Sequence, residues 1–182
     1  MAENNKLMEM LTGYAAAHQH PFNVFVHMIG IPTIMLGVLI PMTWAKMDVA
    51  GLTVSLAHAV LFGFFLFYLT LDRVFAVTFL IGAALLTLLA ARIGDLPLPI
   101  SGGIAAGCFF GGYAAQFIGH AVERSMPVLV RHPIQANLAA PFFTVVELFK
   151  LAGLRERLFD EVQRQIAERR ESESQANSQP AG

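Results

Sequence analysis

Histidine can act as an acid, a base or a metal ligand near neutral pH. The six histidines of this chain are not spread evenly along it. Three of them fall within the stretch YAAAHQHPFNVFVHMIGIP, at the entry to the first long apolar run: His18, His20 and His27. A second polar cluster, QFIGHAVE, closes a later apolar run and supplies Gln116, His120 and Glu123. Neutral imidazole binds iron, zinc and copper, so these two clusters are where the chain could hold a metal.

The spacing of four of these side chains suits one shared metal ion. His120 and Glu123 are three residues apart, which places them on one face of a helix. His18 and His27, from another segment, would complete a set of imidazoles with at most one carboxylate. Such a set with open positions suits non-haem ferrous iron.

Two amides accompany the candidate ligands. Asn23 precedes His27 by four residues, and Gln116 precedes His120 by four, so each could orient the ring nitrogens of a ligand. The alternative is that the histidines form hydrogen bonds between helices and only hold a bundle together. Spacing leaves both readings open, because no compact motif such as H-E-x-x-H is present.

The elements that must position these residues are membrane helices. Hydrophobic residues make up 55% of the 182 residues and charged residues 14%, whereas a soluble domain averages roughly 25% charged. A bilayer core needs about 20 apolar residues per helical span. Four stretches approach this length: residues 24–44, 52–71, 74–91 and 98–119. The runs are continuously apolar, which favours helices over a barrel, so we predict an all-α, polytopic membrane helix bundle.

The remaining segments complete the predicted organisation. Residues 134–151 form a fifth, shorter apolar stretch that carries Glu147, and we expect a half-buried or interfacial helix there. Residues 98–119 are rich in glycine and alanine, which predicts close helix packing at the centre of the bundle. The membrane-embedded domain is predicted at residues 1–154. Residues 155–182 are predicted to form a charged helix that ends in a disordered tail, SQANSQPAG.

Basic residues near the span ends predict the orientation in the membrane. They cluster after the last apolar segment, so the C-terminus should be cytoplasmic: Lys150, Arg155, Arg157, Arg164, Arg169 and Arg170. Four spans return the chain to its starting face, so both termini and both polar clusters are expected on the cytoplasmic side. The N-terminal residues lack the pattern of a cleavable signal peptide, and we predict a bacterial inner membrane protein.

Other features narrow the function classes. The net charge of -1 gives no field for nucleic acid, and Cys108 is the only cysteine, which excludes a disulfide or a thiolate metal cluster within one chain. His58 lies inside the second apolar run, where a buried neutral histidine bonded to a neighbouring helix is the simpler expectation. Six scattered histidines are fewer than the clustered boxes of a di-iron desaturase need.

Three blocks of the sequence resemble, in order, the small membrane-embedded 2-hydroxy fatty acid dioxygenases. The first is a tyrosine, then H-x-x-P-x-N-x-x-x-H and a later proline: Tyr14, His18, Pro21, Asn23, His27 and Pro32. The second is Q-F-[IV]-G-H, then a glutamate and a proline: Gln116, Phe117, Ile118, Gly119, His120, Glu123 and Pro127. The third is A-P-[FY]-F, then a glutamate and L-F: Ala140, Pro141, Phe142, Phe143, Glu147, Leu148 and Phe149.

This resemblance implies a ferrous-iron dioxygenase of fatty acid α-oxidation. The family uses O2 and a long-chain 2-hydroxy fatty acid, and it produces a fatty acid one carbon shorter. Carried over by motif, His18, His27 and His120 are the expected iron ligands, with Glu123 as a fourth ligand or a base. The competing class is a non-catalytic membrane scaffold or lipid-binding protein with structural histidines, which would retain no stoichiometric metal.

Overall fold

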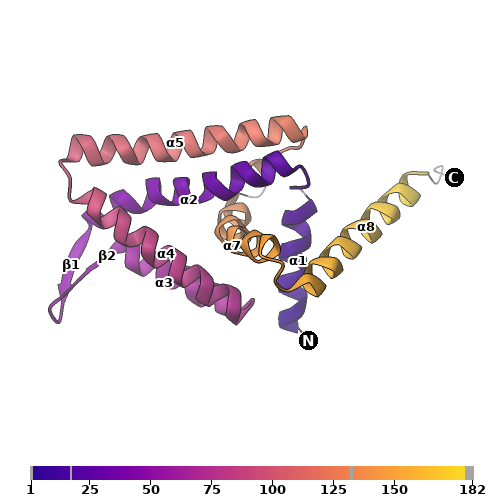
Figure 1. The fold of residues 1–182 in the computed structure, drawn as a ribbon, viewed down its shortest axis with the longest axis horizontal. Helices are drawn as coiled ribbons and strands as arrows, with labels where there is room; N and C mark the ends of the chain where they lie inside the picture. The colour runs from indigo at the N-terminus through magenta and orange to yellow at the C-terminus, as the bar shows by residue number, and fades with distance from the viewer. Residues whose placement is uncertain (1, 17, 132, 179–182) are drawn as a thin grey trace.

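The computed structural model describes residues 2–16, 18–131 and 133–178, which form an almost entirely helical molecule (Figure 1). The helices are α1 (Ala2–Ala16), α2 (Pro21–Trp44), α3 (Leu56–Leu69), α4 (Arg73–Gly94), α5 (Leu98–Glu123), α6 (Val128–Arg131), α7 (Pro133–Leu151) and α8 (Glu156–Ser178). An antiparallel hairpin of β1 (Lys46–Val49) and β2 (Leu52–Ser55) connects α2 to α3. The predicted all-α membrane bundle is confirmed.

Three of the described helices are long and apolar enough to cross a membrane, namely α2, α4 and α5. A fourth span results if α7 and the first part of α8, which are bent by 116° relative to each other, are counted as one. A count of three or four agrees with the prediction of about four spans, but the fourth is not a predicted one, and the second predicted span, residues 52–71, is wrong in its extent. Helix α3 has 14 residues, which is about 21 Å of helix and less than the bilayer core.

The hairpin accounts for this shorter helix. Ala50 and Gly51 have positive φ angles of 50° and 81°, the backbone that a tight two-residue hairpin turn requires. The β-branched residues Thr53 and Val54 favour the strand that follows. The chain therefore pairs residues 52–55 with β1 before it enters α3.

Helix α2 begins at Pro21, three residues before the predicted first span of residues 24–44. Pro21 occupies the first turn, where its missing N–H leaves no hydrogen bond unmade. The ring of His20 caps the helix by accepting the N–H of Phe22 at 3.2 Å. From this start α2 continues as one helix to Trp44, so Asn23 and His27 lie on the same face.

Helices α2 and α5 lie side by side and antiparallel along most of their length (Figure 1). A Cβ on Gly37 of α2 would lie 2.6 Å from the backbone nitrogen of Phe109, and one on Gly112 of α5 would lie 3.1 Å from the carbonyl oxygen of Gly30. Glycine is needed at both places, because the two backbones approach each other directly. The predicted close packing through small residues is confirmed.

The predicted central position of α5 is wrong, because α2 occupies the centre. Helix α2 contacts α3, α4, α5 and α7, and it separates α5 from the α3–α4 pair in Figure 1. Only one face of α5 is covered by these contacts. Its opposite face carries Gly103, Gly107 and Gly111, where an added Cβ would meet none of the described residues within 4 Å.

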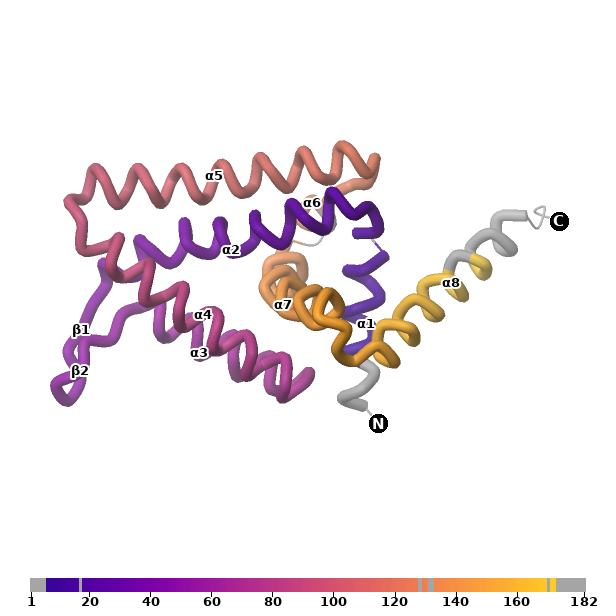
Figure 2. Tube along the Cα trace, in the orientation of Figure 1, coloured from indigo at the N-terminus to yellow at the C-terminus, as the bar shows by residue number. Residues whose placement is uncertain are grey.

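Helices α1, α7 and α8 gather at the end of the bundle where α2 starts and α5 finishes (Figure 2). Helix α7 is seen end-on in Figure 1, so its axis runs across those of α2 and α5. It buries Phe142, Phe143 and Val146 against the bundle, which agrees with the expected half-buried helix. Helix α8 extends to Ser178, into the tail that was expected to be disordered, because no proline or glycine interrupts it; residues 179–182 lie outside the described part of the chain.

Candidate metal centre

His18, His27 and His120 lie together, buried, at the end of the bundle where α1 meets α2 and α5. One ligand atom from each ring lies within 4.8 Å of the corresponding atoms of the other two. The ring centroids are 4.4 Å, 5.0 Å and 4.9 Å apart. The antiparallel course of α2 and α5 brings the two polar clusters of the sequence to this one place.

Two of the rings have a tautomer that the structure determines. The Nδ1 of His18 lies 2.8 Å from the carbonyl oxygen of Tyr14, and the Nδ1 of His27 lies 2.9 Å from that of Asn23. A carbonyl oxygen can only accept, so each Nδ1 carries the proton and donates it. The Nε2 of each ring is therefore left with a free lone pair, the form in which histidine binds a metal.

The Nδ1 of the third ring is also bonded to an oxygen, here that of a hydroxyl, which can donate as well as accept. The Nδ1 of His120 lies 2.9 Å from Oγ of Ser125, in the turn after α5. The nearby Nε2 of His18 is buried and has no hydrogen-bond partner among the described residues, which costs free energy unless another group satisfies it. A metal ion bound between the three Nε2 atoms would satisfy it, so these residues fit a metal.

The surroundings keep the His18 ring neutral. Burial lowers the pKa of His18 to about 3, so the ring is neutral at neutral pH. Its Nε2 then carries no proton that a metal must displace. The ring of Tyr14 stacks on it with centroids 4.0 Å apart and planes 6° from parallel. Burial also raises the pKa of the Tyr14 phenol, which therefore remains neutral.

Glu123 joins the end of α5 to the segment before α2. Its Oε1 accepts the backbone N–H of Gln19 at 2.6 Å and that of His20 at 3.0 Å. Its Oε2 accepts a hydrogen bond from the side-chain amide of Asn23. Both carboxylate oxygens thus hold the chain that carries His18, and direct ligation of a metal by Glu123 stays a prediction.

The two amides occupy different positions. Asn23 is fully buried. Its backbone carbonyl oxygen orients the His27 ring, while its side-chain amide donates a hydrogen bond to Glu123. Gln116 lines the cavity beside the rings, and within the described part of the chain no hydrogen bond joins it to a histidine. Its role in orienting a ligand likewise stays a prediction.

Sequence reasoning missed Ser125. Arg124 adopts a left-handed conformation with φ of 56°, so the chain reverses after α5 and Ser125 folds back onto His120. Neither glycine nor asparagine marks this reversal in the sequence, so no ordinary turn signal predicts it.

Two other histidines lie elsewhere. His20 caps α2 and is exposed. The expectation of a buried His58 inside a span is wrong, because the hairpin moves it to the first turn of α3. There it is exposed, and its Nδ1 lies 2.9 Å from Oγ of Ser55.

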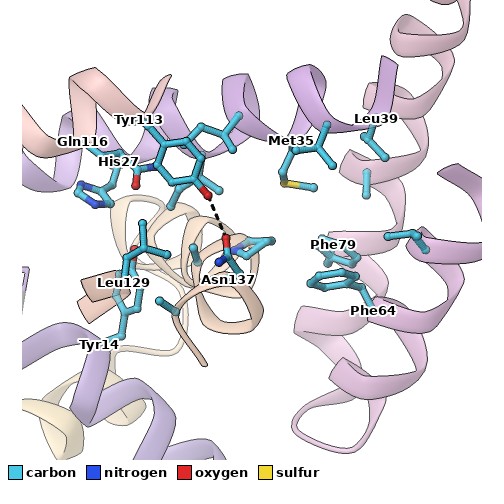
Figure 3. Close-up of a pocket in the computed structure, with 18 of the residues that line it drawn as sticks. Tyr14, His27, Met35, Leu39, Phe64, Phe79, Tyr113, Gln116, Leu129 and Asn137 are labelled. Atoms are coloured by element: carbon cyan, nitrogen blue, oxygen red, sulfur yellow. Dashed lines mark hydrogen bonds between the residues drawn. The ribbon is translucent and has the colours of Figure 1, made fainter. Parts of the chain in front are cut away.

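A cavity of about 280 Å³ opens from the histidines and continues along α2 toward α3 and α4. Figure 3 shows His27, Gln116 and Tyr113 at one end and Met35 with Phe79 toward the other. The Tyr113 hydroxyl donates to Oδ1 of Asn137 at 3.1 Å across the cavity. The cavity is therefore polar next to the metal centre and apolar beyond it.

Comparison with known proteins agrees with the geometry. A family model described as 2-hydroxy-palmitic acid dioxygenase Mpo1-like matches residues 4–151, which include every residue of the candidate metal centre. The chain is 32% identical over 147 residues to the 2-hydroxy-palmitic acid dioxygenase MPO1 of Saccharomyces cerevisiae. The aligned region covers 80% of this chain and 81% of the yeast protein. No solved structure matches the chain. On the family match and this identity, the chain belongs to the Mpo1-like family.

Proposed function

We propose that this protein is an iron-dependent dioxygenase that converts long-chain 2-hydroxy fatty acids into fatty acids one carbon shorter. The observation that carries the proposal is the set of three buried histidines, each with Nδ1 bonded to an oxygen and each with one ligand atom within 4.8 Å of those of the other two. The yeast relative is named as a dioxygenase of 2-hydroxy-palmitic acid, which supplies the reaction class.

The atoms of the proposed reaction balance without a second organic substrate. A 2-hydroxy acid, R–CH(OH)–COOH, and one O2 yield R–COOH, CO2 and H2O. Ferrous iron, when bound, would supply chelation of the hydroxy-carboxylate and activation of O2. Three protein ligands leave coordination positions open for both.

The protein's own residues would hold the iron, keep its ligands in place and enclose the substrate. His18, His27 and His120 would hold the iron through Nε2, and Glu123 would keep the His18 segment against α5 or add a fourth ligand. The hydrogen bonds of both Glu123 oxygens support the first of these roles. The apolar remainder of the cavity would exclude water around the substrate tail.

We further propose that the site faces the cytoplasm, in a bacterial inner membrane. The basic residues of α7 and α8 support the orientation, because these helices gather at the same end as the histidines (Figure 2). A 2-hydroxy fatty acid could then enter from that leaflet with its carboxylate near the interface and its tail among the helices.

The test is one reaction with purified full-length protein in detergent. The protein is loaded anaerobically with ferrous iron, mixed with 2-hydroxypalmitic acid and then exposed to air. Mass spectrometry should detect the acid with fifteen carbons only when iron and oxygen are both present. Absence of product together with absence of retained iron would instead support a structural role for the histidines.

A further inference from the structure

We propose that the cavity is an acyl-chain channel whose length along α2, from His27 to Met42, limits the substrate to about 16–18 carbons. Ala83 of α4 keeps the middle of this channel open. The inference rests on the proposed function. It adds that the length of the channel sets the chain length of the substrate and that Ala83 controls the usable length.

One face of α2 forms the continuous wall of the channel. The lining residues recur every three or four positions, which is the spacing of one helix face: His27, Ile31, Ile34, Val38 and Met42. With a rise of 1.5 Å per residue, the distance from His27 to Met42 is about 22 Å. The channel is therefore longer than one leaflet of hydrocarbon, which is about 15 Å deep.

This distance can be compared with an extended hydrocarbon. A fully extended backbone spans about 3.3–3.6 Å per three bonds, or about 1.2 Å per bond. A channel of about 22 Å thus accommodates about 18 bonds. A 2-hydroxy acid of 16–18 carbons would fill it from the metal centre to the far end, and the yeast relative is named for a 16-carbon acid.

The polarity of the lining imposes one orientation on the substrate. Tyr113, Gln116 and Asn137 lie beside the histidines, where a carboxylate and a hydroxyl would bind (Figure 3). Toward the far end the lining is apolar, and the Thr87 hydroxyl there is already bonded to the Ala83 carbonyl oxygen at 2.8 Å. A carboxylate placed at that end would have no partner, so the tail must occupy it.

Ala83 lies where a larger side chain would obstruct the middle of the channel. It is buried in α4 in the same apolar cluster as Phe79, with Met35 of α2 packed against that cluster. Met35 follows His27 by eight residues, which is about 12 Å along the helix and about 10 bonds of hydrocarbon. An obstruction at this depth would leave room for acids of about 10–12 carbons.

Ala83 also has a matched control in its neighbour. Ala84 is on the same helix but faces outward and is exposed. Ala83→Leu and Ala84→Leu therefore make the same chemical change in the same helix, with the added carbons inside the channel in one variant and outside it in the other.

The experiment measures turnover and binding of 2-hydroxy acids of ten to eighteen carbons in the full-length parent and both variants. Binding is measured on iron-free protein by displacement of a fluorescent polyene fatty acid. Ala83→Leu should lower the ratio of 16-carbon to 10-carbon turnover and affinity by roughly tenfold or more. Ala84→Leu should keep the parent profile. A folded Ala83→Leu protein with an unchanged chain-length profile would overturn the proposal, as would an equal shift in both variants.

The fatty acid binding measurement separates the channel proposal from the proposed dioxygenase function. If no protein turns over but the binding profile shifts as expected, the channel stands and the proposed function fails. Should Ala83→Leu not fold, Val60→Phe at the half-exposed far end tests the same point. It should weaken binding of 18-carbon acids by roughly tenfold while 12-carbon acids bind as before, and an unchanged profile would overturn the channel.

Discussion

At the scale of single residues, the Nδ1 hydrogen bonds define what the histidine cluster can do. A buried histidine that only joins two helices is expected to use both ring nitrogens within the protein, because buried polar atoms are normally hydrogen-bonded. Here His18 and His27 each donate to a backbone carbonyl four residues earlier, and in the part of the chain that the structure describes the buried Nε2 of His18 has no partner. This pattern is typical of metal ligands, whose second ring nitrogen is held by an oxygen.

We predict that replacing any one of these histidines removes the iron. His18→Ala, His27→Ala and His120→Ala should each retain less than a tenth of the parent's iron, because loss of one ligand from a small set removes most of the affinity. Iron per protein is measured by mass spectrometry after anaerobic loading and desalting. His58→Ala is the control, since His58 lies on the exposed start of α3. Full iron content in His120→Ala would remove the central claim.

Glu123 allows a second test at this scale, which distinguishes holding the chain from binding the metal. We predict that Glu123→Gln destabilises even the iron-free protein, by about 1–2 kcal/mol, because the amide cannot accept hydrogen bonds at both ends. The measurement is the thermal unfolding midpoint in detergent without iron. An unchanged midpoint, combined with lost iron binding, would make Glu123 a ligand instead.

At the scale of elements, the contact between α2 and α5 brings the two halves of the site together. The helices meet through backbone atoms at glycines, so their separation cannot increase without moving His120 away from His27. In lipid, where apolar side chains gain little by leaving the solvent, such close packing is a main source of helix association.

We predict opposite effects for alanine at two glycines of these helices. Gly37→Ala should cost about 1–3 kcal/mol and lower iron occupancy, because the new Cβ would lie 2.6 Å from the Phe109 backbone nitrogen. Gly107→Ala adds the same atom where nothing lies within 4 Å, and alanine favours helix, so it should be neutral or slightly stabilising. Unfolding in a denaturing detergent series measures both. Equal losses in the two variants would contradict this account of the interface.

At the scale of the whole molecule, the order of the helices decides which parts share a membrane face. The chain passes along α2, α3, α4 and α5 in alternating directions, so the hairpin lies at one end of the bundle and the candidate metal centre at the other (Figure 2). Arg155 pairs with Asp72 at 2.7 Å and ties the start of the C-terminal region to the α3–α4 turn at the metal-centre end.

This arrangement predicts the sidedness of two engineered cysteines in a Cys108→Ser background. Thr53→Cys, on the exposed hairpin, should react with a membrane-impermeant maleimide in intact cells. Glu168→Cys, exposed on α8, should react only after the membrane is permeabilised. The reverse pattern would place the metal centre on the outer face and contradict the positive-inside assignment.

The sequence by itself determined the class of the molecule and pointed to three histidines, His18, His27 and His120, that the structure brings together. The lengths of the apolar runs predicted about four spans, because a bilayer requires a fixed length of helix and no other backbone. The alternating course of those spans predicted that His27 and His120 would meet. The family resemblance rested on three motif blocks that occur in order in the sequence, and the family match bears it out.

Only the tertiary structure decided how those residues work together. The convergence of the three histidine rings, the bonds of Glu123 to the chain before α2, and the bond of Ser125 to His120 depend on contacts between segments, which local patterns do not encode. The same holds for the central place of α2 and the channel along it, because packing is set by which faces meet. A hydropathy scale does not distinguish apolar residues that line a cavity from those that fill the core, whereas a cavity exists only where facing side chains leave a space.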